Sequence, residues 1–64
     1  MDSRAIIALL EADGWARVRQ RGSHIQFRHP DKAGRVTVAH PNRDIPPGTL
    51  ASIERQSGLK LRRS

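Results

Sequence analysis

Three segments of alternating side chains fill residues 15–39, WARVRQRGSHIQFRHPDKAGRVTVA, and these segments decide the fold. In residues 15–20, 24–29 and 35–39, small or apolar side chains occupy every second position, which is typical of β-strands with one buried face. The two short segments between them are rich in glycine and polar residues, which favour turns. The stretch therefore predicts a three-stranded antiparallel meander.

Helices are expected on both sides of this meander. Ser3 is a favoured N-cap, and the apolar residues after it have helical spacing, so residues 4–13 are predicted to be helical. Gly14 suits the left-handed position that follows a helix. Asp44 is expected to cap a second helix that begins one or two residues later and ends at Gly58.

The length of the chain allows one domain. A chain of 64 residues is near the lower size limit for folding alone, so residues 1–64 are predicted to form a single α+β domain. Its order is α-β-β-β-α, with a three-stranded antiparallel sheet and two helices on one face, which resembles a double-stranded-RNA-binding domain (dsRBD). The absence of cysteine excludes disulfides and cysteine-based zinc sites, and it fits a reducing cytoplasm. The longest apolar run, residues 5–10, is too short to cross a bilayer, so no membrane contact is expected.

The charge balance indicates a polyanionic partner. Twelve Lys and Arg residues against six Asp and Glu give a formal net charge of +6, and ten of the twelve cations are arginines. The planar fork of arginine binds phosphate through two hydrogen bonds, and such a basic domain is typical of nucleic-acid-binding proteins. The alternative is a basic surface that only keeps a small domain soluble.

Strand alternation predicts which side chains share a face of the sheet. If Ile25 and Phe27 face the helices, their neighbours along the strand face the open side, and the same rule places Ala16 and Val18 inward. The residues expected on the open face and its adjoining turn are Arg17, Arg19, Arg21, Ser23, His24, Gln26, Arg28, Arg35 and Thr37. Parity also points Trp15 outward, although its position at the strand end would let it fold over the first helix.

The predicted open face contains no acidic residue. An ordinary solvated strand face carries mixed charges, whereas a face of one sign suffers self-repulsion unless it meets an anion. We therefore interpret these residues as an RNA-binding set that contacts phosphates, with an ordinary solvated sheet face as the alternative.

His24 is the candidate catalytic residue. It follows the tight Gly22-Ser23 turn, and the arginines expected around it favour a neutral imidazole that can accept a proton. His29, next to a proline at a strand end, is interpreted as structural, and His40 could reach either face. The histidines do not converge with one another or with paired carboxylates, so no metal site is predicted.

Three blocks of the sequence, in the same order, resemble the HicA (YcfA-like) toxins. The central block covers residues 14–31 and includes Gly-Ser-His at 22–24, and the later blocks cover residues 36–41 and 48–59. Family members often have proline where Ala39 stands. The similarity extends over about residues 3–60.

This resemblance implies a function and a set of partners. HicA toxins have a dsRBD-like fold and cleave mRNA and other RNAs, which stops translation, and their essential histidine corresponds to His24. It also implies a HicB antitoxin that covers the active face and, often through its own DNA-binding domain, represses the operon together with the toxin. No cofactor is expected. The alternative function is a non-catalytic RNA-binding domain that uses the same face. A DNA-binding repressor is less favoured, because the second predicted helix carries only Arg55 as a cation.

Overall fold

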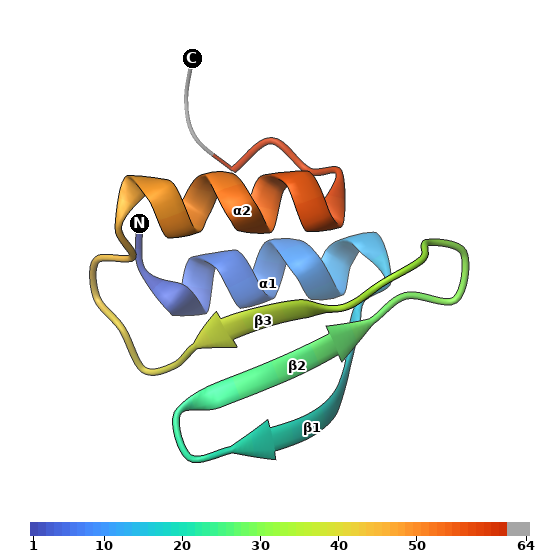
Figure 1. Ribbon diagram of the computed structural model, residues 1–64, viewed down its shortest axis with the longest axis horizontal. Coiled ribbons are helices and arrows are strands. Elements are labelled where there is room, and N and C mark those ends of the chain that lie inside the picture. The colour runs from blue at the N-terminus through green and yellow to red at the C-terminus, as the bar shows by residue number, and fades with distance from the viewer. Residues whose placement is uncertain (62–64) are drawn as a thin grey trace.

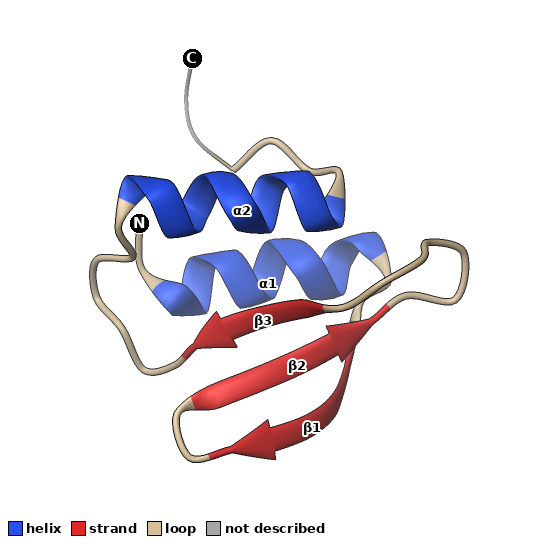
Figure 2. Cartoon of the chain, viewed as in Figure 1, coloured by secondary structure: helices blue, strands red, loops and turns tan. Residues whose placement is uncertain are grey.

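A computed structural model describes residues 1–61 of the chain. Its elements are α1 (Ser3–Asp13), β1 (Ala16–Arg21), β2 (His24–Arg28), β3 (Val36–Ala39) and α2 (Pro47–Ser57), as Figures 1 and 2 show. The strands form one antiparallel sheet in the order β1-β2-β3. The predicted α+β, dsRBD-like order is confirmed. Within the described part of the chain, neither helix is long and apolar enough to cross a membrane.

The helices begin one or two residues away from their predicted caps. Asp2, not Ser3, caps α1, because its carboxylate accepts the N–H of Arg4 at 2.8 Å, and Ser3 becomes a buried helical residue. Pro46 holds the cap position of α2 and offers no side-chain bond, so the expected role of Asp44 is wrong. Asp44 instead forms an ion pair with the N-terminal ammonium group, which lies 3.3 Å from its Oδ1. The predicted helix ends are confirmed by glycines with positive φ at both sites.

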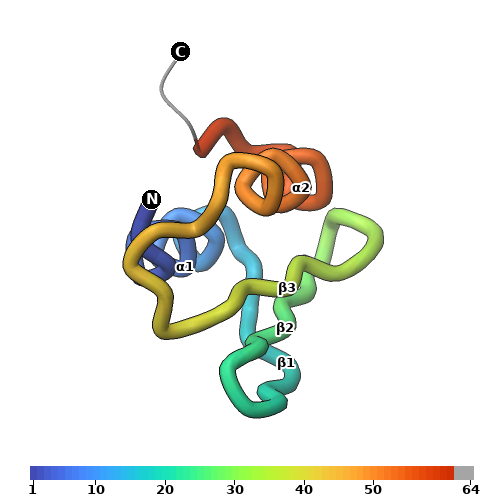
Figure 3. The backbone as a smooth tube through the Cα atoms, turned by 60° about the vertical axis from the view of Figure 1, so that its left-hand side comes forward, coloured from blue at the N-terminus to red at the C-terminus, as the bar shows by residue number. Residues whose placement is uncertain are grey.

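The core lies between the two helices and the strands nearest to them. Both helices pack against β3, and β1 is the strand farthest from them (Figures 1 and 3). The buried apolar residues are Ile6, Ile7, Leu10, Trp15, Ile25, Phe27, Val36, Val38, Ile45, Leu50, Ile53 and Leu61. They come from both helices, from β2 and β3 and from the connecting segments. No residue of β1 is among them.

β1 departs from the predicted alternation. Every residue of β1 is exposed, including Val18 at 54%. Arg17 pairs with Phe27 but Arg19 pairs with Gln26, so the register shifts at a β-bulge around Val18. The prediction that Ala16 and Val18 face the core is therefore wrong: a bulge inserts one extra residue and reverses the parity, and no helix covers this edge strand.

Candidate nucleic-acid interface

The open face of the sheet gathers polar and basic side chains around Gln26. Gln26 pairs with Arg19 on β1 and with Thr37 on β3, and paired residues in an antiparallel sheet point to the same face. Arg35, just before β3, donates from Nη1 to Oε1 of Gln26 at 3.3 Å. Arg28 shares this face because it lies two residues beyond Gln26 on the same strand. The structure thus brings these predicted residues together.

His24 lies at the hairpin end of the same face. It is exposed, and its cross-strand neighbours are Arg21 on β1 and Ala39 on β3. Within residues 1–61 its imidazole makes no hydrogen bond or ion pair. The adjoining turn is held by Gly22, with φ +55°, and by the carbonyl of Ser23, which accepts the N–H of His40 at 2.6 Å. An exposed imidazole on a restrained turn, next to arginine, can exchange a proton with a bound ligand.

Arg17 does not belong to the open face. Its partner Phe27 points toward the helices, so the prediction that Arg17 lies beside His24 is wrong. Arg17 Nε instead lies 3.8 Å from Oε2 of Glu11 on α1, and both side chains are about half exposed. The bulge around Val18 is the reason, because its extra residue reverses the alternation, so that side chains before it point to the face opposite to the predicted one. The open face keeps the other four predicted arginines, at positions 19, 21, 28 and 35.

His29, directly after β2, has a structural environment. Only 7% of its side chain is exposed, and Nε2 donates to the carbonyl of Asp13 at 2.6 Å while Nδ1 accepts the N–H of Asp31 at 3.0 Å. Its ring meets Trp15 edge-on, with centroids 5.3 Å apart. Trp15 is 1% exposed, so it folds into the core and does not face outward. Both nitrogens of His29 are occupied, which supports the structural interpretation of this residue.

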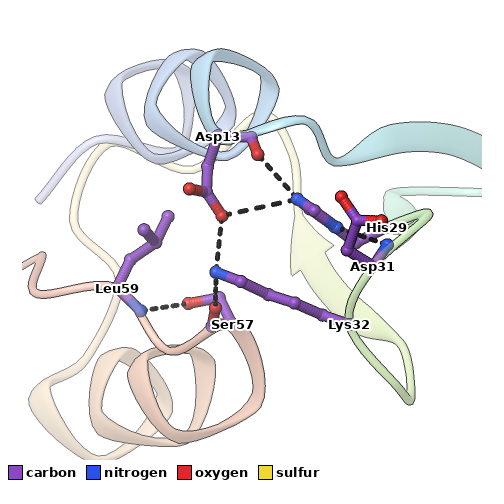
Figure 4. A network of polar contacts seen from close by, with 6 residues as sticks. All are labelled: Asp13, His29, Asp31, Lys32, Ser57 and Leu59. Atoms are coloured by element: carbon purple, nitrogen blue, oxygen red, sulfur yellow. Dashed lines mark hydrogen bonds and ion pairs between the residues drawn. The ribbon is translucent and has the colours of Figure 1, made fainter.

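A polar network joins the C-terminal ends of the two helices (Figure 4). Lys32, in the loop between β2 and β3, donates from Nζ to Oδ2 of Asp13 at 2.7 Å and to the carbonyl of Ser57 at 3.0 Å. The hydrogen bond from Lys32 lowers the pKa of Asp13 below its ordinary value of 3.8, and the charge of Lys32 adds to this effect. No sequence pattern indicated a role for Lys32, because its two partners lie 19 and 25 residues away along the chain.

His40 faces the helices. Its Nδ1 lies 2.7 Å from Oγ of Ser3, which is fully buried in the first turn of α1. The N–H of Asn42 donates to the same Oγ at 2.9 Å. From the sequence, His40 could lie on either face of the sheet. The structure places its imidazole on the helix side, opposite to the side of His24.

Comparison with known proteins places this chain in one family. A family model described as the HicA toxin of bacterial toxin–antitoxin systems matches residues 3–59. The chain belongs to the HicA toxin family. A solved structure, the HicA3 and HicB3 toxin–antitoxin complex, contains a chain that superposes with a TM-score of 0.82. The two chains are 30% identical over 97% of this one and 100% of the other. Among curated proteins, no sequence matches this chain.

This HicA-family domain also groups residues on its helix side that no sequence pattern connects, among them Arg4. Two shallow hollows meet at Arg4, in the first turn of α1, and one of them reaches Arg17 and His40. Sequence alone offered no reason to group residues 4, 17 and 40, because they come from α1, from β1 and from the segment after β3. Over residues 1–61, no three His, Asp or Glu side chains gather as a group that could hold a metal ion.

Proposed function

We propose that this domain is the toxin of a HicA/HicB-type module and cuts mRNA with His24 as the general base. The observation that carries the proposal is the contrast between His24 and its surroundings. His24 is exposed and its imidazole makes no hydrogen bond or ion pair within the described residues, while the strands around it carry arginines and no acidic residue. A free imidazole beside phosphate-binding groups is the arrangement that RNA transesterification requires.

The reaction uses the RNA's own hydroxyl group. His24 removes the proton from a ribose 2′-OH, and the oxygen attacks the adjacent phosphorus. The new O2′–P bond forms as the P–O5′ bond breaks, and the departing O5′ takes up a proton. The products are a 2′,3′-cyclic phosphate end and a 5′-hydroxyl end. The step needs neither an oxidant nor a metal ion.

The arginines of the open face would hold and polarise the phosphate. Arg21 is the cross-strand neighbour of His24, so it is the cation best placed to meet the negative charge that develops on phosphorus. The more distant members of the predicted RNA-binding set would hold flanking phosphates and riboses. These members are Arg19, Ser23, Gln26, Arg28, Arg35 and Thr37. Arg17 lies on the other face and would contact RNA there.

A HicB-like antitoxin is the proposed protein partner. The structurally similar HicA3 chain was solved in complex with HicB3, and the +6 charge of this domain favours an acidic partner. We infer that the antitoxin covers His24. The toxin would contact DNA only indirectly, through the antitoxin, and the complex would act in the cytoplasm. Binding only to the folded state should raise the melting temperature of the toxin. A complex in which His24 stays open to RNA would contradict inhibition by occlusion.

The decisive test is a cleavage assay on the purified protein in EDTA. We expect the RNA to be cut, leaving a 2′,3′-cyclic phosphate or its 3′-phosphate hydrolysis product. DNA of the same sequence should stay intact, because it lacks the attacking hydroxyl. Cleavage of the DNA, or activity that requires Mg²⁺, would refute the proposed chemistry. RNA binding without cleavage would instead support the second candidate, a non-catalytic RNA-binding domain that uses the same face.

A further inference from the structure

The bulge around Val18 places arginines on both faces of β1. Arg19 and Arg21 share the open face with His24, whereas Arg17 lies on the helix side. Every residue of this edge strand is exposed, and no helix packs over it. A polyanion that reached β1 from the open face would therefore meet cations on both sides of the strand.

A trough continues from β1 on the helix side of the sheet. We call it the α1–β1 trough, and it is lined by Arg4, Ile7, Ala8, Glu11, Arg17 and His40. A second hollow adjoins it, sharing Arg4 and adding Arg43 as another cation. Three arginines thus line these two adjoining hollows beside α1, namely Arg17, Arg4 and Arg43.

His40 adds a hydrogen-bonding imidazole to the trough. Its Nδ1 lies 2.7 Å from Oγ of Ser3, which also accepts the N–H of Asn42 at 2.9 Å, so one side of the ring is held in place. The other ring nitrogen, Nε2, makes no hydrogen bond within residues 1–61, and an imidazole N–H is a hydrogen-bond donor. Phosphate and ribose oxygens are acceptors for such a group.

The two carboxylates near the trough do not cancel its positive charge. Asp2 lies at the positive N-terminus of α1 and accepts the N–H of Arg4 there, so the helix dipole offsets its charge. Glu11 is 3.8 Å from Arg17 in an ion pair whose members are about half exposed, and such pairs contribute little to stability. An incoming phosphate can therefore replace Glu11 as the partner of Arg17.

We propose that the α1–β1 trough binds the sugar–phosphate backbone of the RNA strand beyond the phosphate held at His24. The substrate then passes round the free edge of β1, from the open face to the helix side. The proposal rests on the proposed function, and it adds a second RNA-binding surface on the opposite side of the sheet. Continuity supports it, because Arg17 on the helix side and Arg19 on the open face are two residues apart on β1, the strand whose edge the substrate would cross.

The test measures how affinity depends on RNA length. The probes are 2′-O-methyl oligouridylates of about four and about sixteen nucleotides, which lack the attacking hydroxyl and span the usual range of single-strand site sizes. The variant is Arg4→Gln/Arg17→Gln, and its control is Arg55→Gln/Lys60→Gln, which makes the same charge change on α2 and the segment after it. The trough variant should lose about tenfold more affinity for the long probe than the control does. Its slope of log affinity against log salt should fall by about 1.4, or two contacts at about 0.7 each.

A second pair of variants keeps every arginine. Ala8→Glu adds a negative charge inside the trough, and Ala5→Glu adds the same charge to an exposed position of α1 that lines neither hollow. Only the Ala8 variant should weaken binding of the long probe. Melting temperatures show that each variant is folded.

The possible outcomes separate the two proposals. If the trough variants bind the long probe as their controls do, or if both probes lose affinity equally, the trough is not an RNA site. If only antitoxin binding falls, the trough belongs to the protein partner, and the inference is overturned. Failure of the parent protein to cut RNA would count against the proposed function. The length dependence would still test the trough, because it measures binding alone.

Discussion

Two histidines flank β2, and their surroundings differ in every respect that matters for chemistry. His24, at the start of the strand, is exposed and its imidazole has no hydrogen bond within the described residues, whereas His29, just after its end, has both ring nitrogens bonded and its side chain buried. The ring nitrogens of His24 are available to a ligand, and those of His29 are not. The same side chain is thus free at one end of the strand and bonded into the structure at the other.

The positions of the helices explain this difference. The end of β2 near His29 lies against the C-terminal end of α1, where the Asp13–Lys32–Ser57 network also ties in α2 (Figure 4). The end near His24 belongs to the β1–β2 hairpin, and β1 lies away from both helices (Figure 3). The Asp13–Lys32–Ser57 network therefore lies at one end of the sheet, and the candidate chemistry lies at the other.

Removing His24 should have the largest effect on function. His24→Ala creates no core cavity, so its free energy of unfolding should change by no more than about 0.5 kcal/mol. RNA cleavage should fall by about 10²–10⁴-fold, the usual cost of losing a general base. RNA affinity should persist, because arginines supply most of it. Cleavage assays, RNA titration and thermal melting of one purified sample measure all three, and cleavage at the parental rate would mean that another group is the base.

The opposite pattern is expected at His29. His29→Ala removes a buried ring, its edge contact with Trp15 and two hydrogen bonds, so unfolding should become easier by about 2–4 kcal/mol. His29→Gln, whose amide can still donate to the carbonyl of Asp13, should lose less. Cleavage per folded molecule, measured well below each melting temperature, should stay near that of the parent. If a folded His29→Ala protein were as inactive as His24→Ala, His29 would not be purely structural, and the proposed difference between the two histidines would be wrong.

Gly14 tests the structural end without removing a hydrogen-bonding side chain. Its φ is +107°, and a Cβ added there would lie 2.8 Å from Nε2 of His29. Gly14→Ala should therefore destabilise the protein by about 1–2 kcal/mol from backbone conformation alone, plus the cost of moving His29. Chemical denaturation measures this loss, and Gly34→Ala is a control that also has positive φ but open space around its Cβ. Equal losses at both positions would mean that His29 moves aside freely.

Asp13 should have the smallest effect, and one that depends on pH. The pKa of Asp13 is lowered in the folded protein, so its ionised form stabilises the fold above the unfolded value of 3.8. That contribution is lost as the pH falls through the lower folded pKa. Asp13→Asn should thus melt below the parent at neutral pH, and the two melting temperatures should converge in acid. A difference that stays constant down to pH values below the folded pKa would show that the charge of Asp13 is not involved.

Several features of the fold followed from local sequence alone. The alternation in residues 24–28 and 36–39, the helical spacing after Ser3, and the glycines at 14 and 58 each depend on neighbours in the chain, and the structure confirms the elements they predict. The open-face positions of His24, Gln26 and Arg35 also followed, because strand alternation is a local rule. The roles of these residues in RNA cleavage stay predictions.

Other features depended on the tertiary structure. The bulge around Val18 placed Arg17 opposite to its predicted side, because one extra residue reverses parity and nothing in the strand's own pattern marks it. Asp2 and Pro46 took the cap positions expected of Ser3 and Asp44, since the packing of the chain at the start of each helix decides which residue lies there. The sequence by itself determined the elements and the basic face, whose causes are local. Only the folded chain decided that His40 and Arg17 lie on the helix side of the sheet, because those outcomes depend on contacts between residues far apart in sequence.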